Sequence, residues 1–234
     1  MGQFWAEIAS QNHTQEQISF LKTQLKPDST VLDLACGTGR HLIPLSHEGF
    51  YVVGLDVSRR LLKIAHQQGA KFLVLGDLRF LPFKEGAFIA AVSMDTSFGY
   101  LASEGDDANN IAETKRVLNQ GGILVLDVFN RKQLTRKYRG KPAEPKTLEY
   151  SSFVLTQKRS ISISGDQLCD EWILKKKFSG EKAVFEHTVR LYLHSDLERM
   201  LATTGFRVDN VFGDYEAQPY SGDSSRLILV ASAL

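Results

Sequence analysis

Short apolar runs alternate with helix-like segments over residues 30–130 of the 234-residue chain. The runs are rich in Val, Leu and Ile and show little alternation of apolar and polar residues, which is typical of strands buried in a parallel sheet. Parallel neighbours need a crossover connection, which the helix-like segments would supply. The pattern therefore predicts a doubly wound α/β sheet. The runs are TVLDLA (30–35), YVVGLDVS (51–58), KFLVLGD (71–77), FIAAVSMD (88–95) and ILVLDVFN (123–130).

Helix-like segments lie before and between these runs. Residues 4–25 place apolar side chains at helical spacing and are followed by a proline, so they are expected to form one helix. Ser58 is the expected N-cap of the helix that follows the second run. The helix predicted over residues 106–119 is expected to end at Gly121-Gly122, because glycine favours the backbone conformation found at helix ends.

The pattern changes after the fifth run. Residues 131–146 carry seven basic residues and one acidic residue and are interpreted as a basic loop. Three long β-like segments follow, joined by short glycine-containing turns that favour antiparallel hairpins. A helix with Ser195 as its expected N-cap and a terminal hairpin complete the chain. The three segments cover about residues 147–162, 167–178 and 183–193.

These elements predict one Rossmann-like domain with an insertion. Residues 1–130 and 194–234 are expected to form a seven-stranded, mostly parallel sheet with helices on both faces. Residues 131–193 are expected to form the basic loop and a three-stranded antiparallel β insertion, between the fifth strand and the last helix. The chain is long enough for one such domain with a buried core.

Composition argues against several classes of protein. The net charge of +1 gives no general attraction for nucleic acid or for an acidic membrane surface. Cys36 and Cys169 lack the spacing of a disulfide framework or a zinc site, so no metal is expected. We see no signal peptide and no apolar run of about 18 residues. A cytoplasmic protein, as a monomer or homodimer, is therefore expected.

The first apolar run ends in a glycine turn, Gly37-Thr38-Gly39, at the start of a helix. Glycine allows backbone angles that other residues avoid and lets a ligand approach closely. The following helix offers free N–H groups and the positive end of its dipole, which suits a phosphate or carboxylate. Leu42 stands where the dinucleotide motif GxGxxG has its third glycine, so that match is partial. A purely structural turn would look the same.

Carboxylates follow two neighbouring strands. Asp56 ends the second run and can accept hydrogen bonds from the two hydroxyls of a ribose, and Asp77 follows the third run and can accept from the amino group of adenine. Ligands of open α/β sheets bind where such strand ends meet. Asp33 lies within the first run, where an unpaired buried carboxylate is costly. We therefore expect Asp33 to cap the N–H groups of the glycine turn or to meet a ligand's ammonium group.

Four segments, in their order and spacing, resemble the motifs of class I S-adenosylmethionine-dependent methyltransferases. They are VLDLACGTGRH, VVGLDVS, GDLRFLPF and VLNQGGILVLDVFN. The resemblance covers roughly residues 29–130 and implies S-adenosylmethionine as the cofactor. It implies contacts to methionine from the first motif and from Met94, to ribose from Asp56, and to adenine from the remaining residues. Core packing would explain Val57 and Met94 equally well. The implied cofactor-binding residues are Asp33, Ala35, Cys36, Gly37, Gly39, Asp56, Val57, Asp77, Leu78 and Met94.

The acceptor is expected to be a small molecule methylated on N or O. The segment MDTSFGYL lacks the prolines of the (N/D)PP(Y/F) motif found in enzymes that methylate nucleic-acid bases. The antiparallel insertion resembles the lid of small-molecule methyltransferases, including those that methylate glycine and sugar amines. Arg190 would bind a carboxylate or phosphate if its face of the insertion looked into the cleft. The candidate catalytic or acceptor-site residues are His41, Tyr100, Asn130, Arg190 and Tyr192.

Three other hypotheses remain open from the sequence. The basic segment 131–146 would serve as the arm of an RNA methyltransferase, or would be a solvated loop. A regulatory protein would bind the cofactor without turning it over. A nicotinamide-dependent dehydrogenase would use the glycine turn for a dinucleotide, against which the missing third glycine argues.

Overall fold

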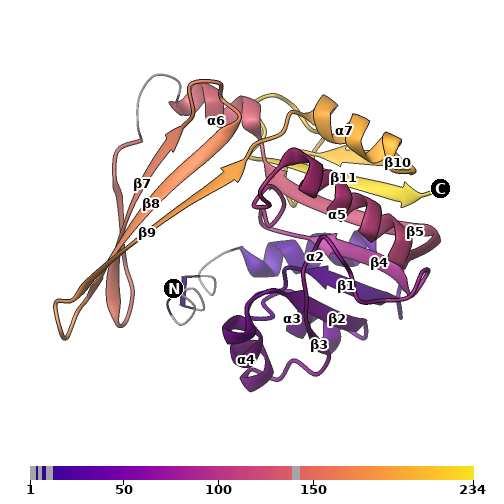
Figure 1. The fold of residues 1–234 in the computed structure, drawn as a ribbon, viewed down its shortest axis with the longest axis horizontal. Coiled ribbons are helices and arrows are strands. Elements are labelled where there is room, and N and C mark those ends of the chain that lie inside the picture. The colour runs from indigo at the N-terminus through magenta and orange to yellow at the C-terminus, as the bar shows by residue number, and fades with distance from the viewer. Residues whose placement is uncertain (1–3, 5–6, 9–12, 139–142) are drawn as a thin grey trace.

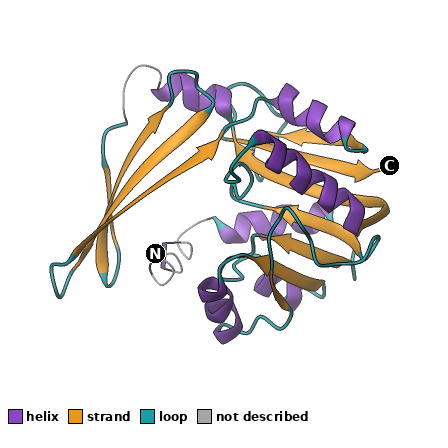
Figure 2. Cartoon of the chain, viewed as in Figure 1, coloured by secondary structure: helices purple, strands orange, loops and turns teal. Residues whose placement is uncertain are grey.

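A computed structural model of the chain describes residues 4, 7–8, 13–138 and 143–234. Figure 1 shows an α/β layer and, projecting from it, a long antiparallel sheet. Figure 2 shows that helices flank the first sheet, whereas the projecting sheet is built from strands alone. We refer to the projecting sheet, strands β6 to β9, as the insertion sheet.

The larger sheet has seven strands in the order β10-β11-β5-β4-β1-β2-β3. Strand β11 runs antiparallel to both of its neighbours, and the remaining pairs are parallel. The predicted seven-stranded, mostly parallel sheet is therefore confirmed. The strands are β1 (Thr30–Leu34), β2 (Tyr51–Asp56), β3 (Leu73–Leu75), β4 (Phe88–Ser93), β5 (Leu118–Phe129), β10 (Phe206–Phe212) and β11 (Arg226–Ala233).

Successive residues of a strand face two separate hydrophobic cores, because side chains alternate across a sheet. Val31 packs with α2 and α3 on one face, and Leu32 packs with α5 and α7 on the other. The sheet is thus doubly wound, as Figure 1 shows. Part of the helix predicted over residues 4–25 lies outside the described residues. The helices of this layer are α2 (Thr14–Gln24), α3 (Leu42–His47), α4 (Arg59–Gln67), α5 (Glu104–Val117) and α7 (His194–Thr203).

Helix ends agree with the sequence predictions in one place and differ in two. Ser58 caps α4 as predicted, with its side chain accepting from the N–H of Leu61 at 3.3 Å. Helix α5 ends at Val117, and Gly121-Gly122 lies inside β5, where a Cβ on Gly122 would be 3.1 Å from the carbonyl of Ile89 in β4. Gly122 therefore permits close strand packing, whereas a Cβ on Gly121, which has a φ of 73°, would meet no atom within 4 Å. Ser195 is not the N-cap of α7, which is Leu193.

The insertion sheet has four strands, in the order β6-β7-β8-β9, rather than the predicted three. The segment expected as one strand over residues 147–162 turns back at Tyr150, whose N–H donates to Phe153 O at 2.9 Å. The rings of these two residues stack, and Glu7 accepts from the N–H of Ser151 at 2.7 Å. No glycine or proline marks this turn. The strands are β6 (Lys146–Glu149), β7 (Phe153–Ile161), β8 (Gln167–Lys176) and β9 (Lys182–Arg190).

The predicted basic loop begins as a helix, α6 (Arg131–Tyr138). Leu134 is the buried residue of this helix and packs on Leu168 and Val189 of the insertion sheet. This packing stabilises a helix in which the clustered positive charges repel one another. Residues 139–142 of this segment lie outside the described residues. Four of the basic residues, Arg131, Lys132, Arg136 and Lys137, thus belong to a helix, which Figure 1 shows at the base of the insertion sheet.

Gly54 in β2 permits the glycine turn to lie against the sheet. A Cβ at this position would be 2.5 Å from Leu42 Cδ1 and 2.6 Å from Cys36 Sγ. We expect Gly54→Ala to lower the free energy of unfolding by about 1–3 kcal/mol, because the core is overpacked. Gly105→Ala, at a helical position where the nearest atom would be 3.6 Å away, is the control and should be neutral or stabilising. Denaturant unfolding measures both, and equal effects would contradict this account.

Candidate active site

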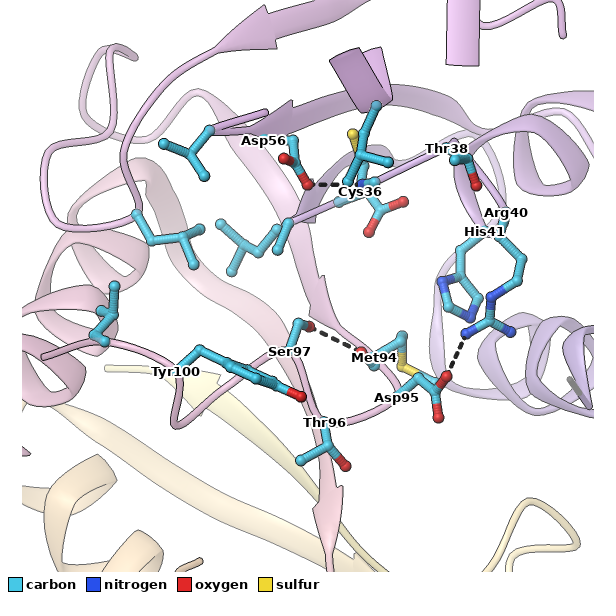
Figure 3. Close-up of a pocket in the computed structure, with 18 of the residues that line it drawn as sticks. Cys36, Thr38, Arg40, His41, Asp56, Met94, Asp95, Thr96, Ser97 and Tyr100 are labelled. Atoms are coloured by element: carbon cyan, nitrogen blue, oxygen red, sulfur yellow. Dashed lines mark hydrogen bonds and ion pairs between the residues drawn. The ribbon is translucent and has the colours of Figure 1, made fainter. Parts of the chain in front are cut away.

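A cavity of about 580 Å³ lies at the carboxyl ends of β1 to β4 and is bordered by β9 of the insertion sheet. Figure 3 shows Asp56 and Cys36 on one side of it and Ser97 and Tyr100 on the opposite side. Strand ends of an open α/β sheet are where ligands of this fold class bind. The sequence-predicted residues that line the cavity are Asp33, Ala35, Cys36, Gly37, His41, Asp56, Val57, Asp77, Leu78, Met94 and Tyr100.

The glycine turn is shaped by alternate residues with positive φ. Ala35, Gly37 and Gly39 have φ of 58°, 55° and 80°. Gly39 does not border the cavity, contrary to its predicted role. A Cβ on Gly39 would be 3.2 Å from Ile43 Cδ1 and 3.3 Å from Ala65 Cβ, so this glycine permits α3 to pack on α4.

Asp56 ties the glycine turn to the end of β2. Its Oδ2 accepts from the N–H of Gly37 at 2.9 Å, and its Oδ1 accepts from the N–H of Ser58 at 2.7 Å. Val57, beside it, is 76% exposed, so core packing does not explain this residue. Met94 both borders the cavity and belongs to the core that contains α2. Asp56, Val57 and Met94 thus all border the cavity.

Asp33 is a buried carboxyl group at the same wall. It is 1% exposed, and its Oδ2 has no hydrogen-bond partner within the described part of the chain. Burial raises the pKa of Asp33 to about 7, against the positive charge of Arg40 and with a small contribution from Asp56. Asp56 accepts from the N–H of Gly37 in the turn, and a hydrogen bond from the backbone N–H of Leu42, where α3 begins, lowers the pKa of Asp33 in part. The contact of Asp33 with a ligand's ammonium group stays a prediction, for which Oδ2 is the available oxygen.

Asp77 borders the cavity and is held by its neighbour Arg79. The Arg79 side chain donates to both Asp77 oxygens, at 2.7–3.2 Å, and its backbone N–H donates to Oδ1 at 2.9 Å. These bonds lower the pKa of Asp77, which keeps the carboxylate charged. Leu78 lies between the two and also faces the cavity.

A strained turn after β4 forms the cavity floor. Asp95 and Thr96 have φ of 54° and 62°, a conformation that costs about 1–3 kcal/mol for residues other than glycine. Asp127 of β5 holds this turn. Its Oδ2 accepts from the N–H of Asp95 at 2.8 Å, and its carbonyl accepts from the N–H of Thr96 at 3.0 Å. Arg226 of β11 donates to Asp127 Oδ1 at 2.7 Å and to Thr96 Oγ1 at 2.8 Å.

The network continues to the N-terminal helix. The Tyr215 hydroxyl donates to Asp127 Oδ2 at 2.7 Å and accepts from Gln17 of α2 at 2.8 Å. Gln17 Oε1 in turn accepts from His41 Nε2 at 2.9 Å and from Arg40, whose guanidinium pairs with Asp95 at 2.9 Å. Figure 3 shows the Arg40–Asp95 pair beside His41. Burial and the charge of Arg40 lower the pKa of His41 well below its usual range, so this ring is neutral.

Asn130 was a candidate acceptor-site residue, and the structure places it away from the cavity. Its amide donates to the carbonyls of Ser221 and Ser224 at 3.1 and 2.8 Å. Its oxygen accepts from the N–H of Lys132 at 3.1 Å and from the Tyr220 hydroxyl at 3.2 Å. The side chain is therefore committed to holding the start of α6 against the loop before β11.

Arg190 and Tyr192 also lie away from the cavity. Both donate to Oδ2 of Asp107 in α5, the tyrosine hydroxyl at 2.7 Å. The backbone N–H of Arg190 donates to Gly99 O at 2.9 Å, which places the end of β9 on the loop between β4 and α5. The face that carries Arg190 and Tyr192 thus packs on α5 instead of looking into the cleft, and the predicted carboxylate contact of Arg190 is not supported.

The cavity wall contributed by β9 is formed by Phe185, Glu186 and His187, which the sequence analysis missed. His187 faces the buried pair of Asp170 and Arg159, with His187 Nε2 3.7 Å from Asp170 Oδ2. Alternation along β8 and β9 shows which residues share a face. The register between the strands, however, decides which part of that face reaches the cavity, and no motif marks it.

Comparison with known proteins identifies the fold and the chemistry. Residues 31–122 match the family model described as "Methyltransferase domain". The putative methyltransferase YqeM of Bacillus subtilis is 26% identical over 234 residues, covering 96% of this chain and 92% of that protein. CcbJ methyltransferase from Streptomyces caelestis has a similar structure, with a TM-score of 0.83 at 19% identity, covering 94% of this chain and 90% of that one. The chain is a class I S-adenosylmethionine-dependent methyltransferase.

Two further similar proteins are N-methyltransferases by name. The glycine/sarcosine N-methyltransferase of Parasynechococcus marenigrum is 30% identical over 199 residues, covering 80% of this methyltransferase and 66% of that protein. The sugar N-methyltransferase KedS8 from a Streptoalloteichus species has a TM-score of 0.74 at 19% identity, covering 98% of this chain and 91% of that one. The described residues of this methyltransferase contain no helix long and apolar enough to cross a membrane.

The raised pKa of Asp33 predicts a pH-dependent stability. Because the folded pKa of about 7 exceeds the ordinary value of 3.8, the unfolded chain loses this proton first as the pH rises. The free energy of unfolding of the ligand-free protein should therefore fall between about pH 4 and pH 7, by at most about 4 kcal/mol. Asp33→Asn should remove this fall and be the more stable protein at pH 8.

Denaturant unfolding at pH 4.5 and pH 8 measures this difference. Asp223→Asn, at an exposed carboxylate paired with Arg136, is the matched control and should keep the wild-type pH dependence. An Asp33→Asn protein with the same pH dependence as the wild type would show that Asp33 is ionised in the fold at low pH.

Proposed function

We propose that this methyltransferase transfers a methyl group to an N or O atom of a small-molecule acceptor, with a nitrogen of an amine favoured. The observation that carries the proposal is the shared cavity. One wall is formed by the glycine turn and Asp56, and the other by the β4 turn and β9. A volume of about 580 Å³ is in the range of sites for small ligands.

The wall at the strand ends fits S-adenosylmethionine. The partnerless Oδ2 of Asp33 is a buried acceptor suited to the ammonium group of the methionine part. Asp56 has lone pairs left for the ribose hydroxyls, since each oxygen accepts a single backbone N–H. The exposed side chain of Val57 and that of Leu78 would pack on the adenine ring, and Asp77 would accept from its amino group.

The charges of the cavity favour an amine acceptor. Among the described residues that line the cavity, Arg40 is the single arginine or lysine, and it is paired with Asp95. Glu186 at the β9 wall has no ion-pair partner in the described residues. No cation is thus left for a carboxylate or phosphate, whereas an ammonium group would be attracted. The relatives that methylate glycine, sarcosine and a sugar nitrogen agree with a nitrogen acceptor.

The chain's own residues would catalyse by positioning. S-Adenosylmethionine, when bound, supplies a methyl group activated by a sulfonium centre. The protein must hold the acceptor's lone pair in line with that carbon and keep water out, which lowers barriers by about 7–11 kcal/mol in well-oriented systems. The strained turn at Asp95 and Thr96, fixed by Asp127 and Arg226, supplies a rigid floor for this alignment.

The structure does not favour an RNA acceptor. Arg131 donates to the carbonyls of Gly165 and Ser164 at 2.7 and 3.2 Å, and Arg136 pairs with Asp223. These two arginines of the basic segment are therefore engaged within the protein and do not form a free stripe for phosphates, as RNA binding would require.

A screen for the acceptor tests the proposal. We expect the protein, incubated with labelled S-adenosylmethionine and a bacterial extract, to place label on a low-molecular-mass amine identified by mass. The RNA fraction of the same extract is the control and should stay unlabelled. Label in RNA would support the RNA hypothesis instead. Cofactor binding without label in any fraction would support a regulatory protein.

A further inference from the structure

We propose that His187 is the catalytic base that takes the proton from the acceptor, and that Asp170 is the positioning residue that orients its ring. The inference rests on the proposed small-molecule transfer. It assigns a chemical role to the β9 wall of the cavity, of which His187 is a lining residue.

Three charged or titratable side chains form a row across the insertion sheet. Arg159 of β7 pairs in register with Asp170 of β8, which pairs in register with His187 of β9. Directly opposite residues of antiparallel strands have neighbouring side chains. His187, at one end of the row, is the member that lines the cavity. Asp170, at the centre of the row, is buried, with a side chain that is 2% exposed.

Asp170 is held in place from its far side. Arg159 donates to both of its oxygens, at 2.8 and 2.7 Å, and Gln157 donates to Oδ2 at 2.9 Å. Such a bidentate pair is both strong and geometrically specific. The carboxylate thus presents a fixed negative charge to His187, at 3.7 Å from Nε2. This contact is longer than a hydrogen bond, but the negative charge favours the tautomer with its hydrogen on Nε2, the ring nitrogen nearer to Asp170.

The other ring nitrogen is available for chemistry. Nδ1 of His187 has no hydrogen-bond partner within the described part of the chain. Aromatic neighbours restrict the ring: Trp172 meets it edge-on with centroids 5.1 Å apart, and Tyr100 lies tilted at 6.0 Å. An oriented imidazole with one unprotonated, unengaged nitrogen at a substrate cavity is the arrangement that general base catalysis requires.

Burial keeps this ring neutral. Burial is the largest influence and lowers the pKa of His187; Arg159 lowers it further and Asp170 opposes both. Tyr100 faces the ring from the loop after β4. Burial, with the charge of Asp170, raises the pKa of Tyr100 to about 12, so this hydroxyl stays protonated. His187 is therefore a free base at neutral pH.

The other titratable groups of the cavity are less suited. His41 is bonded through Nε2 to Gln17, and its strongly lowered pKa makes its conjugate acid too strong to hold a proton. Tyr100 is itself protonated at neutral pH. Glu186 is exposed, and none of the described residues forms an ion pair that would fix its side chain. Geometry and protonation state together therefore select His187.

The proposed step balances as follows. The acceptor binds as an ammonium group; one of its N–H bonds breaks, the proton bonds to Nδ1 of His187, and the bonding electron pair stays on the nitrogen as its lone pair. That nitrogen's lone pair then bonds to the methyl carbon as the carbon–sulfur bond breaks, with its electron pair left on sulfur. His187 afterwards releases the proton to solvent. No oxidant or reductant is needed.

A magnetic resonance titration tests the state of His187 without any acceptor. In protein saturated with S-adenosylhomocysteine, ¹⁵N shifts should show His187 neutral at pH 7, with its hydrogen on Nε2, and titrating below the ordinary value of about 6.5. In Asp170→Asn the pKa should fall further, because the carboxylate no longer favours the cation. A hydrogen on Nδ1, or a pKa above neutrality, would overturn the proposal.

Methyl transfer to the low-mass extract tests the catalytic role. We expect His187→Gln to lower kcat on the order of 10²- to 10⁴-fold while the affinity for S-adenosylhomocysteine stays within about twofold. Added imidazole should restore part of the rate. His66→Gln, on the exposed side of α4, is the control and should behave as the wild type.

The possible failures of this test differ from one another. Wild-type rates in His187→Gln would overturn the role of His187 and leave the proposed function standing. Absence of transfer by the wild type, with S-adenosylhomocysteine bound, would overturn the proposed function and with it the base.

Discussion

The buried carboxylate of Asp127 at the end of β5 holds the parts of the site in one arrangement. It accepts hydrogen bonds from the N–H of Asp95, from the Tyr215 hydroxyl and from Arg226. The turn after β4, the loop before β11 and, through Gln17, the N-terminal helix therefore depend on one side chain. Removing one partner of such a buried pair costs about 3–5 kcal/mol, since the other charge is left without compensation.

This arrangement explains how a strained turn can form part of the cavity. Two successive left-handed residues would relax if the chain were free to do so. The hydrogen bonds to Asp127 and Arg226 fix Asp95 and Thr96, and Arg40, which also borders the cavity, pairs with Asp95. The turn after β4, which lies between the glycine turn and β9 at the cavity, therefore cannot move independently of the sheet. Such rigidity suits a reaction that depends on the alignment of two reactants.

Local patterns predicted the sheet, the glycine turn and the carboxylates at the strand ends, because strand, turn and strand end are each determined by neighbouring residues. Side chains whose partners lie far along the chain could not be predicted in this way. Asn130, Arg190 and Tyr192 have the right residue types, yet their partners at Ser221, Ser224 and Asp107 place them away from the cavity. The register of β8 and β9, which brings His187 to the cavity beside Asp170, likewise follows from long-range pairing.

Calorimetric titration with S-adenosylhomocysteine tests the central claim, that the strand-end wall binds this cofactor, most directly. The account predicts binding by the wild type and a loss on the order of 1–3 kcal/mol in Asp56→Ala, because ribose hydroxyls would lose their acceptor. Asp223→Ala changes an exposed carboxylate that is not among the residues lining the cavity. This variant should bind S-adenosylhomocysteine as the wild type does. Unchanged affinity in Asp56→Ala, or binding of NAD in place of S-adenosylhomocysteine, would contradict it.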